Sequence, residues 1–538
     1  MKHFHIQTRR DFLTTAMKCG ALAALSTLTD IPFVMKQALA ADSNLGRNGK
    51  KLLFIFLRGA NDSLNSVVPI MDDGYATSRP TLAIPKDPAV DYSASGPCDL
   101  SAFNTDPAAP TFNYGSGIRL GNGFAALHPS LKFLAPVYNA GDLALVHRVA
   151  YPKQSRSHFD SQNYWETGNP NNNLSKDGIF YRTIIESGLA HSQALTGVSI
   201  QSSLPLILRG SDAAMTNLTD PTRYDLLGVP NTTQGNSKAA AAVNAANLFP
   251  FPDKMNRELL SLQYENLTST LEIFANLDFS EAGNDYQGLT SVDGESQPYH
   301  LFPTTNAKNG GYALHNSDPQ KYVVPTSSYG FFTNLKNAAI VLDNTDAIIA
   351  GTQMDGFDTH KTQGTLTGSH PNLQRNIAWA MYALQQYFSN PARKGAKKIT
   401  WDDLVVVTLS EFGRTTVENS DKGTDHAEAG VMFVAGGAVK GYGQSHSGVF
   451  GCSPGDTIPW VPGTVAGTSS MFGADSRYLK RAYDYRSVLG RLIRNHLGAS
   501  QAQLTNIIPG YAISGEALLA GGRSSKDGTM IMGEPDII

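Results

Sequence analysis

The chain has 538 residues, a formal net charge of −3, 41% hydrophobic residues and 17% charged residues. This composition fits a globular protein with a large core. The near-neutral charge, with no basic stripe interleaved with aromatic residues, excludes nucleic acid as an expected partner. The length allows several average domains or one large α/β domain with insertions, and we expect a single domain over residues 41–538.

The N-terminus has the features of an export signal. A paired arginine, Arg9-Arg10, precedes the short apolar run Ala21–Leu28 and a small-residue cleavage motif that ends at Ala40. This order predicts a twin-arginine signal peptide over residues 1–40, the twin-arginine translocase as a partner and a periplasmic location. The alternative is an amphipathic helix that stays on the protein. No later run reaches the ~18 apolar residues of a membrane span, so we expect none in the mature chain.

The mature chain begins with a predicted core strand. Lys51–Leu57 is a continuous apolar run, as expected of a strand buried on both faces. Asp62 follows just beyond it, where an aspartate can cap a helix or bind a metal ion. Residues 72–123, rich in Pro, Gly, Ser and Asp, predict an insertion that includes Tyr75 and Arg79 and lies outside the core. A helix over His128–Tyr138 and a buried strand over Asp142–His147 are expected next.

The segment Ser155–Gln162 is predicted to join a strand to a helix. It places the hydroxyl of Ser157, the imidazole of His158 and the carboxylate of Asp160 within four residues. The free amides at a helix N-terminus stabilise an anion, so this is a suitable place for a nucleophile. The same residues also fit a polar capping box.

Further along, strands and helices alternate, with a second insertion expected near residues 279–330. This alternation predicts a doubly wound, mostly parallel α/β sheet. The expected strands are 198–208 (with a loop), 347–353, 404–409 and 431–435, and the expected helices are 238–278, 335–346, 371–388 and 481–497.

Three polar clusters follow the later predicted strands. The first contains Asp358 and His360, and the second contains Glu411 and Arg414 after the apolar run Leu404–Leu409. In open α/β sheets ligands bind at the carboxyl ends of the strands. Oxygen and imidazole ligands suit zinc, manganese or iron.

The third cluster is the pair Asp425-His426. Each cluster alone has a structural alternative, which is a capped turn for the first, an ion pair for the second and a solvated loop for the third. Their joint occurrence at strand ends, together with Asp62 and the Ser157 segment, favours a common site.

These motifs also resemble a known family. The runs 56–63, 156–160, 356–360, 410–415 and 423–426 resemble, in order, the signatures of the bacterial domain-of-unknown-function family 1501. That family is similar to the alkaline phosphatase and sulfatase superfamily of metal-dependent hydrolases and phosphomutases.

The resemblance implies an alkaline phosphatase-like fold and a set of metal ligands. Asp62, Asp358, His360, Glu411, Asp425 and His426 are the implied candidates, with zinc or manganese as the metal and the number of ions open. Ser157 is the implied nucleophile, although counting along the chain favours His158 instead. Arg156 or Arg414 would balance the oxyanion charge.

Two departures from the superfamily pattern affect the second metal site and the metal-binding pair. The first departure is Phe412, which stands where the superfamily has a histidine ligand, so a second metal site would be incomplete or would use another residue. The second is the distance along the chain from Asp358 to His360, which at two residues is shorter than usual.

We therefore expect a periplasmic metal-dependent hydrolase that acts on a small anionic phosphate or sulfate ester. Phosphotransfer between sugar positions shares the fold and stays open. The alternative is a non-catalytic periplasmic protein that keeps the fold for binding or cell-surface assembly. Cys98 and Cys452 could pair in an oxidising compartment or remain free.

Overall fold

A computed structural model of the chain gives the fold. It describes residues 44–98, 115–191, 193–213, 215–219, 241, 269–270, 272–274, 276–280, 285–286, 299–304, 324–393, 399–444, 446–462, 477–512 and 515–538. The expected signal peptide over 1–40 and most of the expected helix over 238–278 lie outside these residues.

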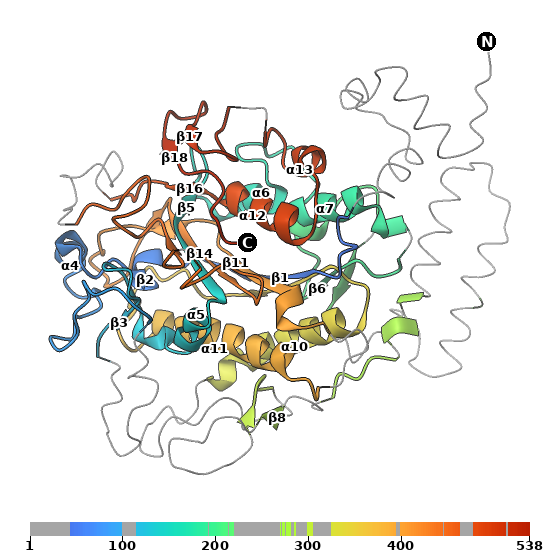
Figure 1. Cartoon of the computed structure of the whole chain (residues 1–538), viewed down its shortest axis with the longest axis horizontal. Coiled ribbons are helices and arrows are strands. Elements are labelled where there is room, and N and C mark those ends of the chain that lie inside the picture. Colours follow the sequence, from blue (N-terminus) through green and yellow to red (C-terminus); the bar gives the residue numbers. More distant parts are fainter. Residues whose placement is uncertain are drawn as a thin grey trace.

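A large mixed sheet forms the centre of the molecule (Figure 1). Its order among the described residues is β15 (Val449–Phe450), β5 (Leu143–Ala150), β14 (Gly430–Ala435), β11 (Leu404–Leu409), β1 (Lys51–Leu57), β10 (Ile349–Met354), β6 (Gly197–Ile200) and β7 (Thr216–Leu218). A further short strand, β16 (Tyr483–Asp484), pairs with β5.

Most of the strands run in the same direction. β1 pairs in parallel with β10 and β11, and β10 pairs in parallel with β6. β14 is antiparallel to both β11 and β5, so β5 again points the same way as β1. The segments that follow β1, β5, β10 and β11, and the segment that precedes β14, therefore meet at one edge of the sheet.

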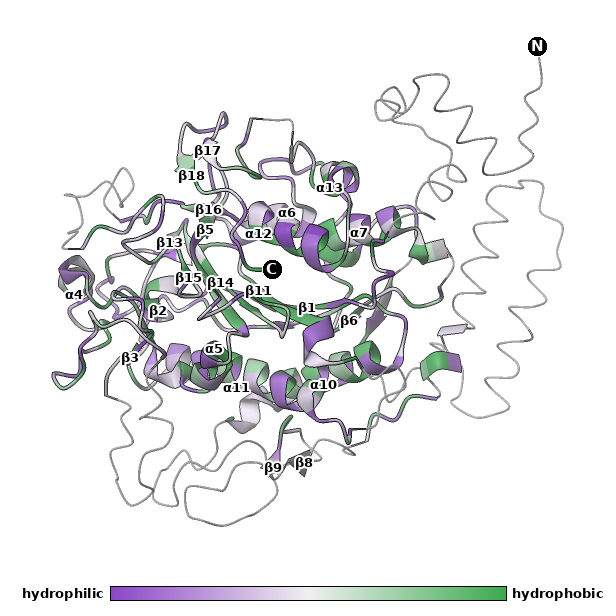
Figure 2. Cartoon of the chain, in the orientation of Figure 1, coloured by the Kyte–Doolittle hydropathy of each residue, from purple (hydrophilic) through white to green (hydrophobic). Residues whose placement is uncertain are grey.

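Helices cover both faces of this sheet (Figure 1). On one side lie α5 (Leu134–Asn139), α10 (Tyr329–Asn344) and α11 (Ser369–Ser389), and on the other α6 (His158–Thr167), α7 (Ile179–Ser187), α12 (Tyr485–Arg491) and α13 (Gln501–Ile507). The strands are hydrophobic along their length because both faces are buried (Figure 2). In β1, Leu53 and Ile55 join the core under α10 and α11, whereas Phe54 and Phe56 join the core under α7 and α12.

The structure confirms a mixed α/β fold with a mostly parallel central sheet. The strands predicted at 51–57 and 404–409 have those bounds. The helix predicted over 371–388 is α11 with two further residues at its start and one at its end. Within the described residues, no helix has the length and apolar character needed to cross a membrane.

Three predicted helices have different bounds, and the one expected over 335–346 is α10, Tyr329–Asn344. The single helix expected over His128–Tyr138 is a 3-10 turn, Pro129–Leu131, followed by α5. Pro136 is the reason, since it has no N–H to donate to the carbonyl of Lys132 in a continuous helix.

The helix expected from residue 481 begins instead after Asp484, whose side chain accepts a hydrogen bond from Arg486 N and caps α12. It continues as a π-helical turn over Leu492–His496.

The expectation that Tyr75 and Arg79 lie outside the core is wrong. The described part of the predicted insertion contains α4 (Asp73–Ser78) and β3 (Ile118–Arg119), which forms a small sheet with β2 (Val67–Val68) and β4 (Ala126–Leu127). Tyr75 is 6% exposed and Arg79 is fully buried. Arg79 is held inside because its guanidinium pairs with the equally buried carboxylate of Asp62.

The two described cysteines do not form a disulfide. Neither Cys98 nor Cys452 is in a disulfide, and both side chains are buried. Burial strongly raises the pKa of the Cys452 thiol, which therefore stays protonated at neutral pH.

The remaining short strands are peripheral. They form three two-stranded pairs, β8 (Asp285–Tyr286) with β9 (Tyr299–His300), β12 (Gly413–Arg414) with β13 (His426–Ala427), and β17 (Gly522–Arg523) with β18 (Met530–Ile531). Of these, the pair β12–β13 lies at the edge where the polar clusters meet.

Candidate metal centre

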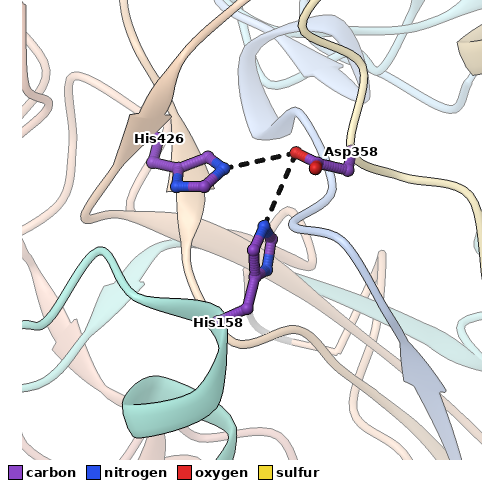
Figure 3. Close-up of side chains that lie close together, drawn as sticks. All are labelled: His158, Asp358 and His426. Atoms are coloured by element: carbon purple, nitrogen blue, oxygen red, sulfur yellow. Dashed lines mark hydrogen bonds and ion pairs between the residues drawn. The ribbon is translucent and has the colours of Figure 1, made fainter.

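Three side chains from separate segments converge at the carboxyl edge of the sheet. His158 comes from the start of α6, Asp358 from the loop after β10 and His426 from β13 (Figure 3). One potential ligand atom from each lies within 4.8 Å of those of the other two. Asp358 Oδ1 is 3.6 Å from His158 Nε2 and 3.2 Å from His426 Nε2.

His158 is oriented by a buried carboxylate. Ser157 caps α6 by accepting from Asp160 N, which makes His158 the first helical residue. Its Nδ1 lies 2.8 Å from Oε1 of Glu411, and Glu411 is fully buried. The hydrogen bond to Glu411 raises the pKa of His158. Because a carboxylate can only accept, Nδ1 carries the proton, and in the neutral ring Nε2 presents its lone pair to the cluster.

Glu411 therefore supports a ligand through its Oε1 atom, while its Oε2 atom is buried with no hydrogen-bond partner among the described residues. Burial alone would raise its pKa, but hydrogen bonds from His158 and others leave that pKa lowered. Oε1 also accepts from Gly59 N at 2.8 Å and from Gln162 Nε2 at 3.1 Å. This histidine–carboxylate pair is the usual second sphere of a metal-bound histidine.

His426 is fixed in the same tautomer. Its Nδ1 lies 2.8 Å from the backbone carbonyl oxygen of Arg156, so Nδ1 donates and Nε2 faces Asp358. Burial lowers the pKa of His426, which favours the neutral ring. Phe412, fully buried, packs its ring 4.9 Å from that of His158 and 4.7 Å from that of His426. Phe412 thus braces both imidazoles without offering a ligand atom.

His360 adjoins the group as a fourth candidate. Its Nε2 lies 3.1 Å from Asp358 Oδ1 and 2.9 Å from His426 Nε2, while its Nδ1 lies 3.2 Å from Asp425 Oδ1. Asp425 also accepts from Arg477 and Asn419. Burial alone would raise its pKa, but these hydrogen bonds and that of His360 lower it. Asp425 consequently orients His360 and faces away from the other ligand atoms.

Arg414 ties the loops of the site together. Its fully buried guanidinium donates to the carbonyl oxygens of Gly59, Ala60, Phe357 and Thr424, and its Nη2 lies 2.6 Å from Asp358 Oδ1. Partial burial would raise the pKa of Asp358, but Arg414 and the neighbouring histidines hold it at about 2. Arg414 therefore positions Asp358, and its N–H groups are committed to the loops that carry the site.

The arrangement fits a divalent metal ion. Three atoms that can present lone pairs, Asp358 Oδ1 and the Nε2 atoms of His158 and His426, lie within 4.8 Å of one another, and His360 Nε2 lies beside two of them. His158 Nε2 is buried with no hydrogen-bond partner among the described residues. Ligands about 2.0–2.2 Å from a tetrahedral zinc ion lie roughly 3.3–3.6 Å from each other. The separations around Asp358 Oδ1 lie close to that range.

Asp62 lies elsewhere in the structure. It is fully buried, caps the 3-10 helix Ser63–Asn65 and accepts from Arg79 Nη1 at 2.7 Å and from Gln363 Nε2 at 2.6 Å. Burial would raise its pKa, but the charge and hydrogen bonds of Arg79 lower it to about 2. The sequence allowed Asp62 either to cap a helix or to bind a metal ion, and in the structure it caps a helix. It is not a member of the converging group.

Ser157 and the Arg156 side chain are exposed at the rim. The Arg156 guanidinium bonds the hydroxyl of Tyr478 and lies 4.2 Å above its ring, while the carbonyl of Arg156 reaches the site. Arg156 and Arg477 are nearly half exposed beside the cluster. An anionic molecule approaching the centre would meet these two cations.

Sequence reasoning missed several supporting residues. Gln162 lies four positions after His158 on the same helix, which places both side chains on the face toward Glu411. Asn419 and Arg477 have no such signal, because they reach Asp425 from loops that the fold brings together.

Residues 334–449 match the model of a family described as "Protein of unknown function (DUF1501)". The matched segment includes Asp358, His360, Glu411 and His426, whereas His158 lies before it. No curated protein and no solved structure matches the chain.

Proposed function

We propose that the protein is a metal-dependent hydrolase of phosphate or sulfate esters, built on an alkaline phosphatase-like variant of the α/β fold and exported to the periplasm. The observation that carries this proposal is the convergence of His158, Asp358 and His426 on one point. His360 adds a fourth candidate atom. The divalent ion, zinc or manganese, would stabilise negative charge on the ester oxygens.

The chain itself would bind and orient the ester. Asp358 is half exposed, with 48% of its side chain accessible, so a small molecule can reach the cluster. Arg156 and Arg477 supply positive charge at the rim, which favours an anionic substrate. Arg414 and Glu411 keep Asp358 and His158 aligned, which reduces the reorganisation that the reaction requires.

Ser157 is the proposed nucleophile. It is exposed at the N-terminus of α6, where free amides stabilise a developing anion, and it directly precedes His158. In the step that we propose, Oγ forms a bond to phosphorus or sulfur while the ester bond to the alcohol breaks. The leaving alcohol takes the bonding electron pair and the hydroxyl proton. Water then cleaves the serine ester and releases the inorganic acid.

Metal content and turnover test this proposal. Purified protein should contain stoichiometric zinc or manganese by mass spectrometry, and Asp358→Ala should lose it, whereas Asp355→Ala, three residues away, should retain it. A panel of aryl phosphates, phosphodiesters and aryl sulfates should include a substrate whose turnover Ser157→Ala abolishes without loss of metal. Protein free of divalent metal, with Asp358→Ala unchanged in every assay, would exclude the proposal.

A non-catalytic binding or assembly role is the second candidate, and Phe412 favours it. Its apolar ring packs beside both His158 and His426 and offers no ligand atom there. In this case the protein would bind metal yet turn over no ester in the panel. Turnover that disappears in both His360→Ala and Glu411→Gln would exclude this role.

A further inference from the structure

Apart from the metal centre, the structure has a cavity at the carboxyl ends of β10 and β6. Its volume is about 490 Å³, which is within the range of small-molecule sites. The start of α10 and one face of α11 close its sides. Eight of the side chains around it carry amide, hydroxyl or carboxylate groups: Gln201, Ser202, Ser327, Ser328, Asn334, Gln353, Asp355 and Asn376.

The chemistry of the lining selects against an anionic ligand. None of its residues is Lys, Arg or His, and Asp355 is its only charged group. Amide and hydroxyl groups both donate and accept hydrogen bonds, as the hydroxyls of a polyol require. Phe331 and Leu373 add apolar surface that can cover the C–H face of a ring. The cavity therefore differs in character from the arginine-rimmed metal centre.

Asn376 provides an independent sign of a ligand. It lies on α11, is only 2% exposed, and donates from Nδ2 to Ser328 Oγ at 2.7 Å. Its carbonyl oxygen Oδ1 is buried and has no hydrogen-bond partner among the described residues. Buried acceptors in folded proteins are nearly always satisfied. A hydroxyl group in the cavity would supply the donor that this oxygen lacks.

The polar groups on the opposite wall are already aligned. Gln201 Nε2 donates to Gln353 Oε1 at 3.4 Å, and Gln353 Nε2 donates to Asp355 Oδ1 at 3.2 Å. Arg58 Nε also donates to Gln353 Oε1, at 3.3 Å. This row holds the exposed carboxylate of Asp355 in place, where it can accept from two neighbouring hydroxyls. A wall fixed before binding loses little freedom when a ligand arrives.

We propose that this cavity binds a neutral carbohydrate. Asn376 and Asn334 would bind its hydroxyls from the helices, Asp355 would accept from the opposite side, and Phe331 would cover a ring face. Asp355 and Asp358 are three residues apart, so their Cα atoms are at most about 10 Å from each other. A sugar in the cavity would thus lie next to the metal centre, but its binding does not depend on metal or on ester hydrolysis.

Saturation-transfer NMR and calorimetry on the full chain test this inference. The probes are glucose, galactose, N-acetylglucosamine, lactose and chitobiose, with glucuronate as the matched anion. At least one neutral sugar should bind, and glucuronate should bind more weakly because Asp355 repels it. Asn334→Ala should weaken binding about tenfold, as expected for the loss of a well-formed hydrogen bond.

The controls separate this site from its surroundings. Asn344→Ala, at the other end of α10, should bind sugar like the unmodified protein, and so should Asp358→Ala. Asn376→Leu should lose binding while keeping the melting temperature of a folded protein; should it unfold, Asn334→Ala alone decides. The inference is overturned when no neutral sugar binds at millimolar concentration, or when Asn334→Ala and Asn344→Ala bind equally well.

Discussion

The buried pair of Asp62 and Arg79 offers the sharpest test of how the residues near the site divide between structure and function. Both side chains have no exposed surface, and Arg79 contacts both carboxylate oxygens, at 2.7 and 3.0 Å. Removing one member of a buried pair leaves the other charge without its partner, which costs about 3–5 kcal/mol. We expect Asp62→Asn and Arg79→Met each to destabilise the protein by that amount at pH 7, while metal content is unchanged.

The pKa of Asp62 gives the net preference for the ionised form, in which the interactions with Arg79 and other groups outweigh the cost of burial. Its fall from 3.8 to about 2 on folding corresponds to about 2–3 kcal/mol in favour of the ionised form. Because the folded pKa is below the unfolded one, this contribution is present above about pH 4 and is lost as the pH falls toward 2. The stability difference between Asp62→Asn and the unmodified protein should therefore narrow below pH 4.

Urea unfolding of both single variants and of the double variant measures these quantities. The double variant should lose about 2–3 kcal/mol less than the sum of the two single losses, because the two groups contact each other. Additive losses would refute the assignment of a direct pair. An Asp62→Asn protein of full stability that no longer binds metal would refute the structural role and restore Asp62 as a ligand.

Three further predictions concern the site and the cysteines. Glu411→Gln removes the carboxylate behind His158 and should weaken zinc binding about 10- to 100-fold in equilibrium dialysis; unchanged affinity would contradict the supporting role of Glu411. Gly59→Ala should reduce both stability and zinc affinity, since Gly59 has φ +107° and an added Cβ would meet Asp358 N at 2.5 Å; calorimetric unfolding that matches the unmodified protein would show that the loop adapts. Cys98 and Cys452 should react with a thiol reagent only after unfolding, because both are buried and neither is in a disulfide; mass mapping of labelled peptides would detect a disulfide instead.

The central strands, and the sheet edge at which they end, were predictable from the sequence. A strand that is buried on both faces is apolar along nearly its whole length, and such a run is easily recognised. The runs at 51–57 and 404–409 are apolar apart from Lys51 and Thr408, and these two residues are buried as well. Parallel strands then bring their carboxyl ends together, so the meeting of Asp358, Glu411 and His426 at one edge follows from the direction of the strands.

The direction of each side chain was not predictable in the same way. Glu411 and Asp62 follow strands as expected, yet they turn toward His158 and Arg79, and these partners lie 253 and 17 residues away in the chain. Arg79 is in a segment whose composition indicates an exposed insertion, and only its pairing with Asp62 explains its burial. The capping requirement of α6 uses the Ser157 hydroxyl and gives His158 the position facing the cluster.

The central position of β1 has a consequence for the time course of folding. Leu52 pairs with Ile349 and Lys51 pairs with Leu404, so β1, the first strand among the described residues, has neighbours about 300 and 350 residues later. Contacts of such long range form slowly. A nascent chain that ends before residue 349 carries an apolar strand with both of its hydrogen-bonding edges open. Such an intermediate is prone to aggregation, and the chain needs protection until synthesis has passed β11.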